Sequence, residues 1–421
     1  MCGNQRTSLK CFIEDCKIRT MNMYRIFVVL FCVKFQTFAD ETNMMMNFTD
    51  IVGFYGYPTE IHEIETEDGY LLDVYRVPRS PKTTTKSTNS FPVLVNHGLM
   101  GSAENFVIGG PSKALAYVLA DKNYDVWFCN SRGSWHSRKH KTMDPDRDLR
   151  QFWKFSWHEI GYYDLPATID YILNVTQKSK LHYIGHSQGT TTFFALMAEK
   201  PEYNEKIRVM LALAPSALLE HIKDPSLKLL APTYRYLQTL AESFEIYELV
   251  PKRLLSHDAL RSIIGSLCDS QSATRILCMN VFMAMSGFSE EQLDPDTIPL
   301  ILQTGPAGAS LYQVLHYAQL VNTGKFIKYD WGPKENLLKY NSTVPPEYNL
   351  THVTCPVALF YGDADLLTTK EDVTILATRL PNVVDVYRVP YDNWSHMDFL
   401  WAKDIDKLLN KHLLRVLHKF R

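Results

Sequence analysis

The chain lacks an excess of charge of either sign. Its 421 residues include 44 Lys and Arg against 46 Asp and Glu, a formal net charge of −2 with neutral histidines. Proteins that bind nucleic acids present a basic surface to the phosphates, and this balance offers none. The sequence also has no internal repeat and no long low-complexity tract, which excludes a repeat architecture. It gives no indication of an oligomeric state.

Long apolar runs are missing as well. The best candidate is residues 26–33, preceded by Arg25 and followed by Thr-Phe-Ala at 37–39. This is the pattern of a signal peptide, with a basic residue, an apolar stretch and a small residue at the cleavage position. The run is too short to span a bilayer, so we expect no transmembrane anchor. We predict that residues 1–39 are an N-terminal extension and signal peptide that is removed; the alternative is a buried N-terminal helix.

Cysteine is scarce beyond that leader. Four of the eight cysteines precede residue 40, and the others are Cys129, Cys268, Cys278 and Cys355. In an oxidising compartment Cys268 and Cys278 are close enough in sequence to form a local disulfide. Cys129 and Cys355 lie in apolar strand-like contexts and are expected to be buried thiols. Glycosylation sequons that we expect to be usable stand at Asn47, Asn174, Asn341 and Asn349. A fifth, at Asn393, is expected to stay unused because it lies three residues from His396.

Apolar residues, at 46% of the chain, are ample for a large core. Strand-like segments at 91–96, 124–129, 181–186 and 207–213 alternate with helical segments at 112–122, 165–176 and 189–199, after a hairpin over 61–77. This alternation predicts an α/β fold with a mostly parallel central sheet and flanking helices. We divide the chain into the leader at 1–39, a first core part at 40–215, a helical cap or lid insertion at 216–319 and a second core part at 320–421.

The insertion contains many apolar side chains. We expect most of them to form its own core and the rest to line a pocket for an acyl chain; examples are Leu229, Leu230, Tyr234, Tyr236, Phe282 and Met283.

The most informative segment is 185–189, which reads Gly-His-Ser-Gln-Gly. An apolar run precedes it and a helical segment follows it, so Ser187 falls on a strand-to-helix turn. That is the setting of a nucleophile elbow, in which a G-x-S-x-G turn exposes the serine above the sheet. The alternative is an ordinary Gly-Ser turn.

A serine nucleophile needs an acid and a base, which follow it in the order Ser, Asp/Glu, His in this type of fold. Asp365 comes shortly after the strand-like segment 356–361, and His396 follows the strand-like segment 383–389. Because the carboxyl ends of parallel strands share one sheet edge, Ser187, Asp365 and His396 are expected to meet there. Taken singly, Asp365 could be a helix-capping acid and His396 a surface histidine.

An oxyanion hole is expected from the segment 97–102, which follows the strand-like segment 91–96 and contains His97-Gly98. One backbone N–H would come from Leu99 and the other from Gln188, the residue after the nucleophile. His182 and His186 have no further ligand cluster beside them, so we expect no metal site. We interpret His182 as a strand residue and His186 as support for the elbow.

With these residues in view, the chain resembles the acid lipases, the group that contains lysosomal acid lipase and gastric lipase. The resemblance runs from about Gly53 to Trp401 and rests on ordered blocks at 56–58, 66–70, 97–99, 124–127, 130–133, 156–160, 163–167, 185–190, 306–308 and 396–399. It implies an α/β-hydrolase fold, with Ser187 as nucleophile, Asp365 as acid, His396 as base and no cofactor. Cys129, Ser134 and Ser286 depart from the usual family residues.

The expected activity is hydrolysis of carboxylic esters of neutral lipids, triacylglycerol or cholesteryl ester, through an acyl-enzyme. The substrate would be met at a lipid–water interface by a secreted or lysosomal enzyme. Two alternatives stay open: a soluble carboxylesterase, and a lipid-binding carrier with vestigial activity. The intact triad argues against the carrier, whereas the choice between lipase and esterase depends on the inserted cap.

Overall fold

The computed structural model describes residues 47–82, 90–251 and 289–421. The predicted leader, the Cys268–Cys278 pair, Phe282 and Met283 lie outside these ranges and stay predictions. A central sheet runs in the order β1-β2-β4-β3-β6-β7-β10-β11, and β5 pairs with β2. The strands are β1 Glu60–Glu65, β2 Tyr70–Val77, β3 Phe91–Asn96, β4 Tyr124–Cys129, β5 Lys139–His140, β6 Leu181–His186, β7 Ile207–Leu213, β10 Val357–Tyr361 and β11 Val383–Arg388.

The sheet is antiparallel at one side and parallel over the rest. β1 pairs antiparallel with β2, and β2 with β4. From β4 to β11 each neighbouring pair is parallel. Every residue of β4 and β6 is buried, as expected for parallel strands covered on both faces. The mostly parallel sheet that the sequence predicts is therefore confirmed.

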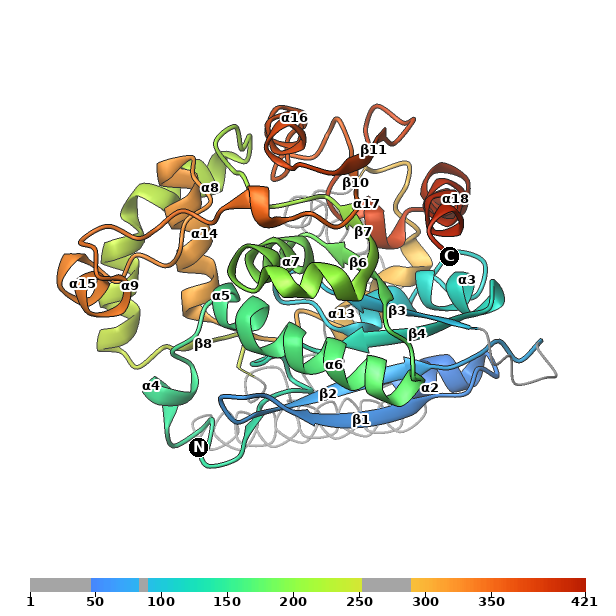
Figure 1. The fold of residues 1–421 in the computed structure, drawn as a ribbon, viewed down its shortest axis with the longest axis horizontal. Coiled ribbons are helices and arrows are strands. Elements are labelled where there is room, and N and C mark those ends of the chain that lie inside the picture. Colours follow the sequence, from blue (N-terminus) through green and yellow to red (C-terminus); the bar gives the residue numbers. More distant parts are fainter. Residues whose placement is uncertain (1–46, 83–89, 252–288) are drawn as a thin grey trace, which may run out of the picture. The chain divides into compact units, whose positions relative to one another are not determined.

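Helices cover both faces of this sheet (Figure 1). One core contains side chains of α6 Leu165–Thr176, α7 Gln188–Glu199, α14 Leu311–Thr323 and α16 Lys370–Arg379. The other contains side chains of α2 Phe48–Phe54, α3 Leu115–Asp121, α13 Ile298–Thr304, α17 Asp398–Trp401 and α18 Lys411–Lys419. Shorter helices are α4 Leu149–Phe152, α5 Trp157–Glu159 and α15 Pro333–Tyr340.

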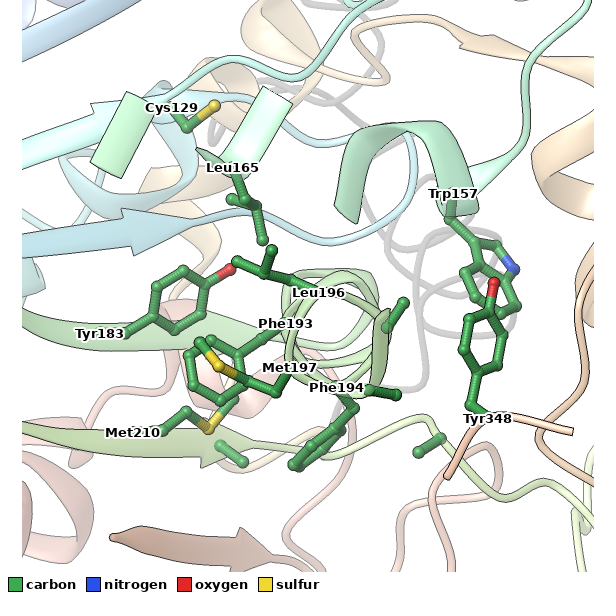
Figure 2. Packing of buried hydrophobic residues seen from close by; sticks show 14 of the residues in the cluster. Cys129, Trp157, Leu165, Tyr183, Phe193, Phe194, Leu196, Met197, Met210 and Tyr348 are labelled. Atoms are coloured by element: carbon green, nitrogen blue, oxygen red, sulfur yellow. The ribbon is translucent and has the colours of Figure 1, made fainter. Parts of the chain in front are cut away.

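The core between α7 and the sheet holds the turn that precedes this helix. Figure 2 shows Phe193, Phe194, Leu196 and Met197 of α7 packed among side chains from β6 and β7. Within it, the Tyr183 hydroxyl donates to the Gly189 carbonyl at 2.8 Å and accepts from the Asn96 amide at 3.0 Å. These bonds tie β3, β6 and the start of α7 together.

The predicted insertion contains α8 Pro225–Leu230, α9 Tyr234–Ser243, the short strand pair β8 Glu248–Leu249 and β9 Ala309–Ser310, α13 and the start of α14. One expectation for it is wrong. Leu229 is 76% exposed, Leu230 49% and Tyr236 82%, so these side chains do not form a core; Tyr234 alone of the four described examples packs against the buried cluster. α8 and α9 contact α14, but no residue of α9 is buried, so this contact leaves much of the helix surface exposed.

Cys129 and Cys355 are free and buried, as predicted. Burial raises the pKa of the Cys355 thiol to about 12, so this thiol is protonated and inert at neutral pH. In the part of the chain that the structure describes, no helix is both long and apolar enough to cross a membrane.

Candidate active site

Ser187 stands at the turn between β6 and α7 in a rare backbone conformation, with φ 50° and ψ −116°. Its N–H donates to the Leu213 carbonyl at the end of β7, at 3.0 Å. The turn requires the two flanking glycines. A Cβ on Gly185 would lie 2.7 Å from the Gly189 carbonyl group, and a Cβ on Gly189 would collide with the Asn96 carbonyl. The sequence pattern thus produces a strained, tightly packed strand-to-helix turn.

Asp365 and His396 are in direct contact. Nδ1 of His396 lies 2.8 Å from Oδ2 of Asp365, and both residues are buried. Asp365 also accepts hydrogen bonds from the N–H groups of Leu367 and Thr368 and from the Thr368 hydroxyl. Burial alone would raise the pKa of Asp365, but the His396 ring and the Thr368 bonds hold it below its ordinary value. The carboxylate is therefore ionised and fixes the ring with Nδ1–H toward it, leaving Nε2 as an acceptor.

His186 connects the serine turn to the histidine loop. Its Nε2 lies 3.0 Å from the His396 carbonyl oxygen, and the two rings are 5.0 Å apart between centroids. Burial, with the neighbouring His396 ring, lowers the pKa of His186 to about 3, so the neutral ring donates its Nε2–H. This agrees with the predicted supporting role. Ser187 itself makes no hydrogen bond to His396 among those of the described residues; the link runs through its neighbour His186.

The loop with Leu99 lies beside the serine. A Cβ built on Gly98 would be 3.2 Å from Cβ of Ser187. His97 fixes the start of this loop, because its Nδ1–H donates to the Gly98 carbonyl at 2.7 Å and its Nε2 accepts from the Ser131 N–H. The Met100 carbonyl accepts from the Ala307 N–H at 2.7 Å. Gln188 is the first residue of α7, so its N–H has no acceptor within the helix. Gly98, the residue before Leu99, thus lies against Ser187, and Gln188 follows the serine in the chain; the oxyanion role of the Leu99 and Gln188 N–H groups stays a prediction.

The neighbouring carboxylates are engaged elsewhere. Asp363 pairs with Arg388 at the surface, and Asp398 bonds to Ser395 and Ser289 rather than to the His396 ring. Within residues 47–82, 90–251 and 289–421, no cluster of three His, Cys, Asp or Glu side chains is arranged to hold a metal. The five sequon asparagines Asn47, Asn174, Asn341, Asn349 and Asn393 are all exposed; their glycosylation stays a prediction.

Sequence reasoning missed three supports of this site. Thr368 bonds to Asp365, Ala307 bonds to the Leu99 loop, and Asp398 holds the backbone before His396. Two of them lie in blocks that carry the family resemblance, 306–308 and 396–399, but a block does not reveal which backbone group its residues contact.

The comparisons with known proteins agree with the fold. A family model described as "alpha/beta hydrolase fold" matches residues 92–403, and one described as "partial alpha/beta-hydrolase lipase region" matches residues 48–110. Lipase 1 of Drosophila melanogaster is 39% identical over 88% of this chain and 79% of its own length. The gastric triacylglycerol lipases of Bos taurus and Homo sapiens are 37% and 36% identical, over 87% and 85% of this chain and 89% and 87% of theirs. The chain belongs to the α/β-hydrolase-fold lipase family that includes gastric triacylglycerol lipase.

Proposed function

We propose that the protein hydrolyses neutral lipid esters by a Ser187–His396–Asp365 triad. The observation that carries this proposal is the combination of a strained serine turn with a buried, hydrogen-bonded Asp365–His396 pair at the same edge of the sheet. The geometry lacks a direct Ser187–His396 hydrogen bond; such bonds often form only when substrate is bound.

The chemistry follows from the protonation states. His396 Nε2 takes the proton of the Ser187 hydroxyl as the oxygen attacks the ester carbonyl. The Leu99 and Gln188 N–H groups donate to the resulting oxyanion. As the tetrahedral intermediate collapses, the ester bond breaks and the leaving alcohol receives the proton from His396. Water, activated by the same ring, then hydrolyses the acyl-enzyme and restores Ser187. Asp365 orients the ring and stabilises its cation.

An apolar surface supports lipid rather than small soluble ester as the substrate. Leu229, Tyr236, Leu240 and Phe244 are 76%, 82%, 57% and 69% exposed; we call these four residues the α8–α9 apolar face. Tyr236, Leu240 and Phe244 are spaced four residues apart and lie on one side of α9 and its C-cap. Exposed apolar surface of this kind is typical of contact with lipid or a protein. Entry into the secretory pathway, followed by secretion or by delivery to a lysosome, fits this substrate and belongs to the proposal.

The test is a series of esters with increasing acyl length, with the Ser187→Ala variant as the control. We expect kcat/KM to rise with chain length, by about 0.8 kcal/mol for each methylene that becomes buried, and to rise sharply where the substrate aggregates. Ser187→Ala should lose on the order of a millionfold in kcat and its reaction with a fluorophosphonate probe. A maximum at acetate or butyrate without any response to an interface would favour the soluble carboxylesterase. A folded Ser187→Ala variant with near-normal activity would contradict the assignment of the triad.

A further inference from the structure

Asp398 uses one oxygen of a fully buried carboxylate to hold two segments of the chain. Its Oδ2 accepts from the Ser395 N–H at 2.8 Å and from the Ser395 hydroxyl at 3.0 Å. The same oxygen accepts from the Ser289 hydroxyl at 2.9 Å and from the Ser289 N–H at 3.4 Å. Asp398 is 0% exposed. One atom therefore joins the residue before His396 to a residue more than a hundred positions earlier.

The first of these segments carries the proposed catalytic base. Ser395 directly precedes His396, and the carbonyl groups on either side of it are also engaged. The Trp394 carbonyl accepts from the Ala364 N–H at 3.1 Å, beside Asp365, and the His396 carbonyl accepts from His186. Between these two carbonyl groups lies the Ser395 N–H, and its bond to Asp398 holds the backbone there.

The second segment is the last part of the predicted insertion before α13. Residues 289–294 lie along residues 402–404: the Lys403 N–H donates to the Gln292 carbonyl at 2.8 Å, and Leu293 bridges to Ala402. The Gln292 side chain bonds to Asp404, through its Nε2 at 3.1 Å. Several ties thus hold this segment to the chain after α17. Two contacts also reach the loop that contains the histidine: the Tyr391 hydroxyl donates to Glu291, and Asp398 joins Ser289 to Ser395, the residue next to His396.

Asp398 is poorly suited to a purely stabilising role. Burial raises its pKa to about 6, although the bonds from Ser395 and Ser289 act in the opposite direction. Its Oδ1 has no hydrogen-bond partner, and no Lys, Arg or His in the described part of the chain pairs with it. Burying an ionised group without a cation costs stability. A carboxylate kept under these conditions points to a positional requirement.

We propose that Asp398 is a positioning residue for His396, and that through Ser289 it couples the placement of the end of the insertion to the placement of the base. The proposal rests on the proposed function, since it assumes that His396 is the base. Asp398 does not act on the substrate; it sets the backbone from which the His396 ring extends toward Asp365 and Ser187. Movement of the 289–294 segment would therefore be transmitted to Ser395, the residue before His396, through the Asp398 carboxylate oxygen.

The test compares Asp398→Ala with Asp404→Ala in the full-length enzyme. Asp404→Ala is the matched control, because it removes the bond from the Gln292 amide to the Asp404 carboxylate without touching Ser395, while the N–H of residue 404 still donates to Gln292. The readout is the rate at which a soluble fluorophosphonate modifies Ser187, measured across pH, with the melting temperature recorded in parallel. We expect Asp398→Ala to slow the reaction by on the order of 100-fold, the size of effect that a misplaced catalytic group produces, and to displace the midpoint of the pH profile. Asp404→Ala should stay within about twofold of wild type, as expected of a change remote from the reacting groups.

Further variants separate positioning from folding. Asp398→Asn keeps an acceptor oxygen, and we expect it to fold normally and show a smaller loss with the same displacement of the pH profile. Ser289→Ala removes the hydroxyl bond from the insertion and leaves the longer bond from the Ser289 N–H, and adding it to Asp398→Ala should cause no further loss. Equal rates for Asp398→Ala, Asp404→Ala and wild type, or unchanged pH profiles in both Asp398 variants, would overturn the positioning role.

His396→Ala distinguishes the two proposals. If this variant still reacts at the wild-type rate, the triad itself is wrong. If His396→Ala is inactive while Asp398→Ala is fully active, only the positioning role is wrong.

Discussion

Ser187 adopts a conformation that favours glycine, since its φ of 50° is combined with a ψ of −116°. Backbone strain of this kind costs of order 1–3 kcal/mol and persists only where the surrounding structure enforces it. Here the enforcement comes from the Leu213 carbonyl, which accepts the Ser187 N–H, and from the close approach of Gly189 to β3. The strain lifts the side chain out of the turn, where an ester can reach it.

This strain predicts different stabilities for two inactive variants at one position. Ser187→Gly should be more stable than Ser187→Ala by about 1 kcal/mol or more, because glycine adopts positive φ without a steric penalty and alanine does not. Both variants should be inactive. Urea unfolding of the two proteins measures the difference, and Ser187→Ala is the matched control because both lack the hydroxyl. Equal stabilities would show that the turn is not strained.

Asp365 has the environment that the acid of the triad needs, whereas Asp363 does not. The four donors around Asp365, including His396, keep it ionised, whereas Asp363 pairs with the partly exposed Arg388 at the surface. We expect Asp365→Asn to lower kcat by about 10⁴-fold, the loss typical when this acid becomes an amide. Asp363→Asn should stay near wild type. Steady-state kinetics on one ester compares them, and severe impairment of Asp363→Asn instead would reassign the acid.

At the scale of the element, the strands were predictable and the surface of the insertion was not. The segments 91–96, 124–129, 181–186 and 207–213 match β3, β4, β6 and β7, because strands buried on both faces are continuous apolar runs between polar turns. Their order also predicts that Ser187, Asp365 and His396 share one sheet edge. The exposure of Leu229 and Tyr236 was missed, because apolar content predicts burial but does not say whether a partner covers each helix face.

The α8–α9 apolar face should matter for lipid aggregates and not for dissolved esters. Replacing both Tyr236 and Leu240 by serine removes two side chains that would each contribute roughly 1.5–3 kcal/mol on burial in lipid. We expect at least about tenfold weaker activity on a long-chain triacylglycerol emulsion, since each 1.4 kcal/mol is a factor of ten in binding. Activity on a dissolved short-chain ester should be unchanged. The control is Val386→Ser on β11, a residue that is 47% exposed and lies outside the insertion. Equal losses on both substrates would mean that the face serves folding.

At the scale of the whole molecule, the described part of the chain contains several histidines that burial keeps neutral. Burial lowers the pKa of His97 and of His182 to about 4, and lowers that of His316 well below its ordinary value. They lie on different elements and serve different contacts: His97 holds the Leu99 loop, His182 bonds to the Phe420 carbonyl, and His316 bonds to Ser156 and Ile327. The pKa of Asp398 is raised to about 6, so its protonation favours the folded protein, whereas protonation of these histidines favours the unfolded chain. The change in the free energy of unfolding at acid pH therefore depends on both the buried histidines and Asp398.

His182 isolates one side of this balance because it lies at the start of β6, away from the serine turn. Its pKa falls from 6.5 to about 4 on folding, so between these pH values the unfolded chain binds the proton more readily than the folded protein. His182 therefore costs nothing above pH 6.5 and reduces the free energy of unfolding by about 1.4 kcal/mol for each pH unit down to about pH 4. His182→Gln keeps a donor for the Phe420 carbonyl but has no imidazole to titrate, so its free energy of unfolding does not fall for this reason. Denaturant unfolding from pH 7 to pH 4 should thus show wild type losing roughly 3 kcal/mol relative to the variant, with the exposed His418→Gln as control. Parallel stability curves for wild type and His182→Gln would show that the buried ring is protonated as easily in the folded protein as in the unfolded chain.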